Sequence, residues 1–138
     1  MNFVKNFLQL PLMNPWLLRQ MQLPNAAHAV IPPEKITAYL LNEAHPRGRG
    51  KAAFFTRFGF TASQPEVFLT ALLTHAKTHA VASTRPAKDG ICYAVEGILV
   101  TPDGRNPSVL TVWFVGPAQT FPRLVTAYAH IDAHSERA

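Results

Sequence analysis

The residues best suited to chemistry lie in one short basic segment of the chain. No aspartate or glutamate occurs between Glu43 and Glu66, and that interval holds one histidine and four cations: His45, Arg47, Arg49, Lys51 and Arg57. Histidine can take or give a proton near neutral pH. Lysine and arginine stabilise anions, and arginine can grip a phosphate with two parallel hydrogen bonds. The segment therefore predicts a phosphate-facing patch, and the alternative is a solvated loop and helix face.

A loop followed by a helix is expected to carry these side chains. The stretch from His45 to Gly50 contains one proline and two glycines, which is typical of a loop. Lys51 to Phe58 then predicts a short helix that ends at Gly59. Backbone N–H groups at a helix start attract anions. In the alternative interpretation, His45 caps the preceding helix and Lys51 is an ordinary first-turn cation.

Two further helices are expected around this junction. Prolines at the start and an apolar repeat of helical spacing predict a helix over residues 33–42. Ser63 and Glu66 match a capping box, which predicts a helix running to about Lys77. After residue 80 the apolar period changes towards two, and strands are expected over 81–85, 91–100, 109–115 and 123–130.

This order of elements predicts an α+β fold, in which N-terminal helices pack on one face of a four-stranded antiparallel sheet. The expected core positions in the strands are Ile91, Tyr93, Val95, Val112, Phe114 and Leu124. The helix residues expected to cover them are Leu40, Phe55, Phe68 and Leu72.

Composition limits the classes of protein that remain. The chain has 138 residues, of which 48% are hydrophobic and 15% charged, as expected for one packed domain. We expect an N-terminal extension (1–20), a single domain (21–130) and a polar tail (131–138). No apolar run approaches the ~18–20 residues that cross a bilayer, and we expect a cytoplasmic protein. The net charge of +5 favours anionic partners.

Several short motifs resemble a small uncharacterised bacterial domain family over residues 21–130. They are Leu23-Pro24-Asn25-Ala26, Ile31-Pro32-Pro33-Glu34-Lys35-Ile36, Tyr39-Leu40-Leu41-Asn42, His45-Pro46-x-Gly48-Arg49-x-Lys51-Ala52-x-x-Phe55, Val112-Trp113 and Pro122-Arg123-Leu124-Val125-Thr126-Ala127-Tyr128. The His-Pro-x-Gly-Arg-x-Lys-Ala motif is also similar to the front of toxin domains that resemble metal-independent ribonucleases of the barnase–EndoU–colicin–RelE superfamily. Gly50 departs from the pattern, because a bulkier residue, often histidine, is expected there.

The resemblance implies RNA cleavage without a metal. Such a reaction needs a base for the 2′-OH, an acid for the leaving 5′ oxygen and cations for the phosphorane. The side chains predicted to do this chemistry, with the groups of the first three converging on one anion, are His45, Lys51, Arg123, Thr126 and Tyr128. Thr126 and Tyr128 share a strand face by their spacing. The side chains predicted to contact the substrate are Arg47, Arg49, Arg57 and Trp113, the last by stacking on a base.

The implied partners are RNA and a cognate antitoxin or immunity protein, with no cofactor, no metal and no membrane. A second hypothesis is a non-catalytic interaction module, the antitoxin-like or structural half of such a pair. Paired histidines four residues apart, His75 with His79 and His130 with His134, can hold zinc, but no third ligand is evident. Cys92 is the single cysteine, which excludes a disulfide framework within the chain. Its expected role is that of a small buried apolar side chain.

Overall fold

Helices occupy the first half of the described chain and strands the second half. The computed structural model describes residues 21–118 and 120–130, so the expected N-terminal extension and polar tail lie outside the described residues. The helical segments are η2 (Ala26–His28), α3 (Pro33–Lys35), η3 (Ile36–Leu40), α4 (Arg49–Arg57) and α5 (Pro65–Thr78). The strands are β1 (Val81–Ala87), β2 (Gly90–Ile98), β3 (Ser108–Val115) and β4 (Arg123–Ala129).

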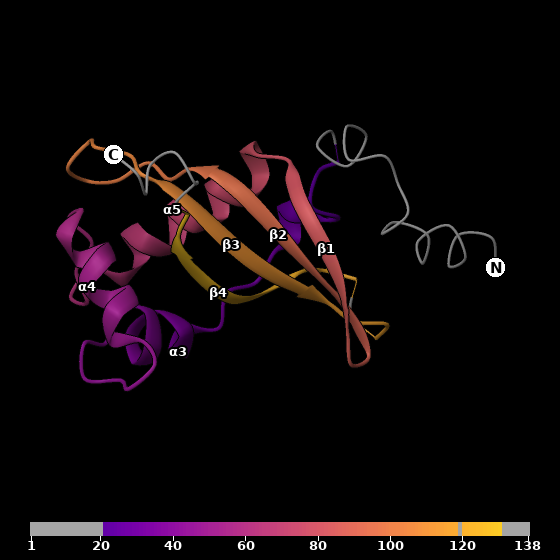
Figure 1. Cartoon of the computed structure of the whole chain (residues 1–138), viewed down its shortest axis with the longest axis horizontal. Coiled ribbons are helices and arrows are strands. Elements are labelled where there is room, and N and C mark those ends of the chain that lie inside the picture. Colours follow the sequence, from indigo (N-terminus) through magenta and orange to yellow (C-terminus); the bar gives the residue numbers. More distant parts are fainter. Residues whose placement is uncertain (1–20, 119, 131–138) are drawn as a thin grey trace, which may run out of the picture.

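The four strands form one antiparallel sheet in the order β1-β2-β3-β4. Each strand therefore pairs with its neighbour in sequence, and the register places Tyr93 opposite Trp113 and Val95 opposite Thr111. Figure 1 shows α5 behind the sheet, with α3 and α4 on the side of β4. These observations confirm the predicted α+β class and its four-stranded antiparallel sheet.

The core lies between the helices and one face of the sheet. The buried strand residues that share this face by register are Val81, Tyr93, Val95, Val109, Trp113, Leu124 and Ala127. The helical segments contribute Ile36, Leu40, Phe55, Phe68, Leu72 and Ala76. Phe55, Phe60 and Phe68 form an aromatic cluster, with ring centroids 4.6–6.5 Å apart.

The predicted core positions are correct except at two places. Ile91 and Phe114 are only half-buried. On β3 the side chain that faces the helices is Trp113, which pairs with the core residue Tyr93, so Phe114 points to the opposite face. Val112 is buried although it also lies on that opposite face.

The first predicted helix contains a π-helical turn. Residues 33–42 were expected to be regularly helical, but α3 ends at Lys35 and η3 continues with wider turns, closed by a Leu41 N–H to Ile36 carbonyl bond of 2.8 Å. Such turns occur frequently at functional sites. Here the turn contains Tyr39, which packs against the core and also lines a pocket.

The capping box predicted for α5 is absent. The helix begins at Pro65, its N-cap is Gln64, and that cap makes no side-chain hydrogen bond. Ser63 lies one residue too early and its hydroxyl contacts the Thr61 hydroxyl at 3.2 Å. Proline at the first helical position, where its missing N–H costs little, sets this start.

A buried polar network joins α5 to the sheet. His75 is 2% exposed, and its Nε2 donates to the carbonyls of Gly97 and Val109 at 3.1 and 3.0 Å. Its Nδ1 faces the Thr111 hydroxyl at 3.3 Å, and that hydroxyl accepts a 2.8 Å bond from the Trp113 indole. Burial, together with the neighbouring His79, lowers the pKa of His75 to about 4. His75 is therefore a neutral structural group.

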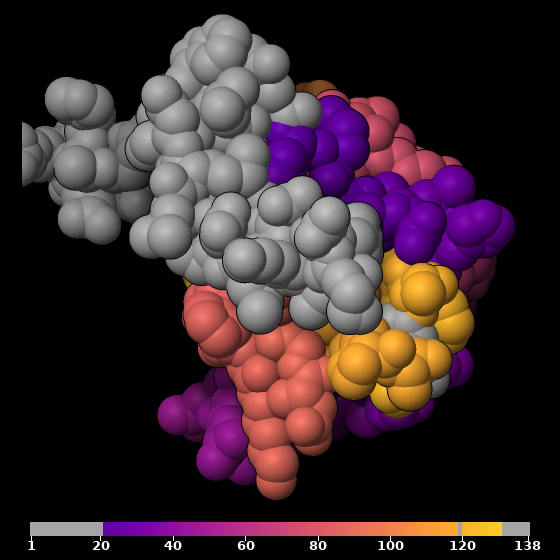
Figure 2. Space-filling model, turned by 90° about the vertical axis from the view of Figure 1, so that its right-hand side faces the viewer, coloured from indigo at the N-terminus to yellow at the C-terminus, as the bar shows by residue number. Residues whose placement is uncertain are grey.

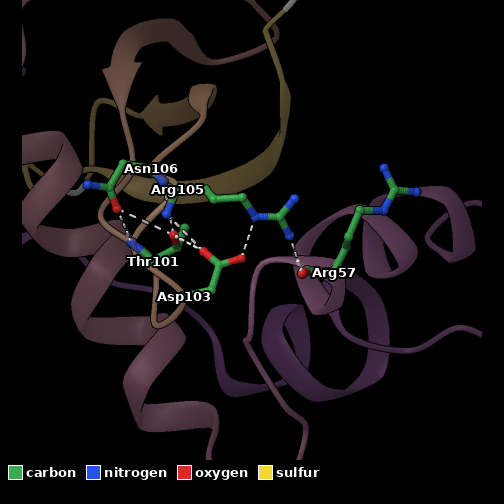
Figure 3. Close-up of polar contacts among 5 residues, drawn as sticks. All are labelled: Arg57, Thr101, Asp103, Arg105 and Asn106. Atoms are coloured by element: carbon green, nitrogen blue, oxygen red, sulfur yellow. Dashed lines mark hydrogen bonds and ion pairs between the residues drawn. The ribbon is translucent and has the colours of Figure 1, made fainter.

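The loop between β2 and β3 is fastened to the end of α4 (Figure 3). Arg105 donates from Nη2 to the Arg57 carbonyl at 2.7 Å and from Nε to the Asp103 carboxylate at 2.7 Å. Its guanidinium also lies 4.4 Å from the ring centroid of Phe58. These contacts satisfy a helix-end carbonyl, which otherwise lacks a partner. They hold the helix whose first turn carries Lys51.

The segment before α3 pairs with the start of β4. The Val30 N–H donates to the Pro122 carbonyl at 2.8 Å, and the Leu124 N–H donates to the Val30 carbonyl at 3.0 Å. The Asn25 side-chain amide also donates to the Thr120 carbonyl at 2.7 Å. Figure 2 shows this indigo segment against the orange-yellow residues that lead into β4. The pairing fixes β4, the edge strand, beside α3 and η3.

Candidate functional site

An open pocket of about 630 Å³ lies where α3, η3, the start of α4 and β4 meet. It is lined by Glu34, Lys35, Ala38, Tyr39, His45, Arg47, Lys51, Val125, Thr126 and Tyr128. These residues come from three separate stretches of sequence, so the pocket exists only in the folded chain.

A bulge in β4 positions the strand side of the pocket. Thr126 pairs with Val112 and Leu124 pairs with Trp113, which leaves Val125 as an extra residue in β4. Bulges bend a strand and re-aim its side chains, often next to functional sites. Beyond the bulge, Thr126 and Tyr128 lie on the same face, as their spacing predicts.

Lys51 is the central cation of the pocket. Its Nζ lies 5.5 Å from the ring centroid of Tyr39 and 6.0 Å from that of Tyr128, so one ammonium faces two phenol rings. Lys35 approaches Tyr39 from α3, with its Nζ 5.4 Å from the ring centroid. Both distances to Tyr39 are within the range of cation–π attraction.

Tyr39 is the group whose acidity the pocket changes. Burial raises the pKa of its phenol, but interactions with the Thr126 hydroxyl and the Lys51 ammonium, and the charges of Lys51 and Lys35, lower it by more. The net result is a pKa below the ordinary 10.0. The buried Thr126 oxygen has no well-formed hydrogen bond, so its approach to the phenol is a polar contact rather than a full bond.

His45 lies at the rim of the pocket and is half-buried. Its ring packs edge-on against Tyr39, with centroids 5.0 Å apart. Its Nδ1 accepts hydrogen bonds from the backbone N–H groups of Arg47 and Gly48, at 3.0 and 3.1 Å. These bonds stabilise the turn that leads into α4, whereas the alternative expectation was that His45 caps the preceding helix.

The charge of the pocket is positive. Lys35, Arg47 and Lys51 contribute three cations, and Glu34 is the single carboxylate in the lining. Thr126 and the two tyrosines add hydroxyl groups. This arrangement suits an anionic group beside an aromatic or sugar ring, because cations supply charge and hydroxyls supply hydrogen bonds.

The structure gathers part of the predicted set and leaves the rest outside. The predicted residues in the pocket lining are His45, Arg47, Lys51, Thr126 and Tyr128. Those outside the lining are Arg49, Arg57, Arg123 and Trp113. Arg49 and Arg57 are exposed on α4. In Figure 3 the Arg57 side chain points away from the β2–β3 loop, to which it offers only its carbonyl.

Two of these placements correct the sequence-based expectation. Trp113 offers no surface for stacking, because its side chain is fully buried and its indole is bonded to Thr111. Arg123 is exposed at the first position of β4, opposite Phe114, and does not join His45 in the pocket lining. Arg123 and Tyr128 are five positions apart on β4, with the bulge at Val125 between them.

Sequence reasoning missed Tyr39, Lys35 and Glu34 as pocket residues. Tyr39 lies three residues after Ile36, and this helical spacing favours an apolar role for its ring. A signal was present, however, since Lys35 and Tyr39 are four residues apart and such residues are neighbours on one helix face.

The described residues contain neither a metal site nor a membrane-spanning helix. Within residues 21–118 and 120–130, no group of three histidine, cysteine or acidic side chains is placed to hold a metal ion. His75 and His79 lie with ring centroids 4.8 Å apart, but His75 uses both nitrogens in the buried network. None of the helices in those same ranges has the length and apolar character that a bilayer crossing requires.

A comparison with known protein families shows which family the chain belongs to. The sequence pattern of the family described as "Domain of unknown function (DUF6883)" matches residues 22–131. The chain belongs to this family. The pocket of the DUF6883 domain lies entirely within the matched residues. No curated protein matches the chain significantly.

One solved structure has a similar fold to this DUF6883 domain. It is described as "Contact-dependent growth inhibition toxin - immunity protein complex from Klebsiella pneumoniae 342". The TM-score is 0.54 with 15% sequence identity, and the similarity covers 78% of this chain and 98% of that chain. At this identity the similarity establishes a shared fold.

Proposed function

We propose that this DUF6883 domain is an RNA-cleaving toxin domain that works without a metal and is held inactive by a cognate antitoxin or immunity protein. The observation that carries the proposal is the Lys51 ammonium, which faces both Tyr39 and Tyr128 in a cationic pocket. The toxin context is supported by the fold similarity to a chain from a toxin–immunity complex and by the motif resemblance to ribonuclease toxins.

The proposed reaction is an internal attack of the RNA 2′ oxygen on the adjacent phosphorus. Tyr39, whose pKa is lowered, takes the 2′-OH proton as its phenolate form. The ammonium of Lys51 and the guanidinium of Arg47 stabilise the charge of the phosphorane. The bond from phosphorus to the 5′ oxygen breaks, and that oxygen takes a proton from the Tyr128 hydroxyl. The products are a 2′,3′-cyclic phosphate and a 5′-hydroxyl end.

The Lys51 ammonium between two phenols can assist this reaction in two ways. The cation lowers the pKa of the phenol that must lose a proton and attracts the phosphate to the same place. The hydroxyl oxygen of Thr126 is buried and makes no full hydrogen bond within the described residues, so that it can orient the Tyr39 phenol as it ionises.

A second candidate function is a non-catalytic interaction module. The observation that favours it is that the structural neighbour is named for a toxin and an immunity protein together, and the shared fold does not distinguish these roles. A module of this kind would bind a partner protein and leave RNA intact.

The experiment that separates the two is cleavage of end-labelled RNA by the purified full chain in EDTA, with analysis of the product ends. We expect 2′,3′-cyclic phosphate ends from the wild-type chain and a loss of at least tenfold in rate for Tyr39→Phe, which keeps the ring but removes the hydroxyl. Intact RNA with a folded wild-type chain would support the interaction module. Linear 3′-hydroxyl ends would contradict the proposed reaction.

A further inference from the structure

The hydrogen bonds of His45 determine which of its nitrogens carries the proton. Backbone N–H groups can only donate, and those of Arg47 and Gly48 both point at Nδ1, at 3.0 and 3.1 Å. Nδ1 must therefore be unprotonated. A neutral imidazole with a bare Nδ1 has its proton on Nε2.

The alternative ring orientation is disfavoured by the same contacts. Turning the ring over would place the Cδ2–H of His45 against the two N–H groups and leave both without that acceptor. The turn itself is closed by backbone bonds, since the His45 carbonyl accepts from Gly48 and Arg49 at 3.1 and 2.9 Å. The imidazole thus completes the turn that begins α4.

The surroundings keep the turn in place. The Gly48 backbone lies directly against Tyr39, so that a side-chain carbon at position 48 would collide with the Tyr39 carbonyl and lie 2.9 Å from its Cδ1. The ring of His45 packs edge-on against Tyr39 at 5.0 Å. These contacts pack the turn against η3.

Within the described residues, the hydrogen bonds of the His45 ring use Nδ1 and leave Nε2 unused. His45 is among the lining residues, and the charged groups in that lining are Lys35, Arg47, Lys51 and Glu34. An anion held by the cations would meet an N–H donor at this rim. A proton-transfer role would need the opposite arrangement, because a base at Nε2 requires the proton to reside on Nδ1.

We infer that His45 is a fixed neutral N–H donor, which offers Nε2–H to an oxygen of a bound phosphate group, and that it does not carry protons in the reaction. The inference rests on the proposed function only for the claim that the bound group belongs to RNA. It replaces the expectation that His45 exchanges protons with the substrate.

The first test observes the tautomer directly. Long-range ¹H–¹⁵N NMR correlations of the full chain at pH 7.5 should show His45 Nδ1 as an unprotonated ring nitrogen and Nε2 as a protonated one. Addition of inorganic phosphate should shift the Nε2–H resonance of His45, whereas that of the buried His75 should stay in place. A protonated Nδ1 on His45 would overturn the inference, as would an Nε2–H that phosphate leaves unchanged.

Two substitutions test the roles of the two ring nitrogens of His45 independently. His45→Asn keeps an acceptor at the distance of Nδ1 from the backbone and removes the donor at the distance of Nε2. His45→Gln keeps an amide N–H at the distance of Nε2 and removes the acceptor. We expect the asparagine variant to melt at the wild-type temperature and bind phosphate about tenfold more weakly, which is the loss expected for one hydrogen bond to a charged group. We expect the glutamine variant to melt at a lower temperature.

The outcomes separate this inference from the proposed function. Wild-type phosphate affinity in the asparagine variant would refute the donor role, as would a lowered melting temperature in that variant alone. If the tautomer and the phosphate shift are as expected but the wild-type chain leaves RNA intact, His45 is still an N–H donor and the ribonuclease proposal fails. If RNA is cleaved but Nδ1 carries the proton, the ribonuclease proposal stands and the inference fails.

Discussion

Replacing the buried His75 should remove a large part of the acid sensitivity of folding. The pKa of His75 falls from the ordinary 6.5 to about 4, because burial opposes the charged ring and His79 adds to the effect. Between these two pH values the unfolded chain binds more protons at this position than the folded chain does. Stability is therefore complete above about pH 6.5 and is lost as the pH falls towards 4.

The magnitude follows from the difference between the two pKa values. A fall from 6.5 to about 4 spans roughly 2.5 pH units, and each unit is worth about 1.36 kcal/mol, so the loss is roughly 3 kcal/mol. That is a substantial share of the 5–15 kcal/mol that typically stabilises a small domain. His75→Gln keeps an amide donor near the Gly97 and Val109 carbonyls and has nothing to titrate.

Urea unfolding followed by circular dichroism from pH 4.5 to 7.5 measures this loss. Because the range stops above the folded pKa of about 4, the wild-type chain should lose about 2.5 kcal/mol more than His75→Gln over it, and the exposed His28→Gln should behave like the wild type. Equal slopes for the wild type and His75→Gln would refute the reasoning, because another group would then be responsible for the acid sensitivity.

Three further predictions follow from the site and the chain. Gly48→Ala should lower the free energy of unfolding by about 1–3 kcal/mol, because the added methyl group would collide with Tyr39. Gly50→Ala has open space around it and should raise the free energy of unfolding by about 0.5–1 kcal/mol. Equal effects of the two substitutions in urea unfolding would contradict this. The RNA cleavage rate should rise with pH along a limb below pH 10.0, as Tyr39 ionises, and Lys51→Met should move the limb to higher pH; an unmoved limb would exclude Tyr39 as the base. Deleting residues 1–20 should leave a cooperatively folding domain, and a loss above ~3 kcal/mol in calorimetry would show that the segment belongs to the core.

The element order could be predicted because it depends on local patterns. Apolar spacing and the Pro and Gly positions place the helices and strands to within a few residues. The inward face of β3 could not be predicted from the sequence, because Val112, Trp113 and Phe114 are consecutive apolar residues and alternation does not choose between them. The pairing of Trp113 with the core residue Tyr93 determines that Trp113 faces the helices. The start of α5 similarly depends on Pro65 taking the first helical position rather than on Ser63.

The candidate site was predictable where it is local in sequence and not where it depends on tertiary pairing. His45, Arg47 and Lys51 are close together along the chain, so a single turn brings them to the same pocket. Tyr39 enters the pocket because η3 widens into a π turn, which the sequence pattern does not indicate. Arg123 lies outside the pocket because its place is set by pairing with Val30 and Phe114.

The measurement that tests the central claim most directly compares Lys51→Met with Lys88→Met in RNA cleavage with EDTA present. Both substitutions remove one positive charge, but Lys51 faces the two tyrosines of the pocket and Lys88 is exposed in the β1–β2 turn. Our account predicts a loss of at least a hundredfold for Lys51→Met, as is typical when a charge-stabilising group is removed, and near-wild-type cleavage for Lys88→Met. Equal cleavage by both variants, with unchanged melting temperatures, would contradict the assignment of this pocket as the active site.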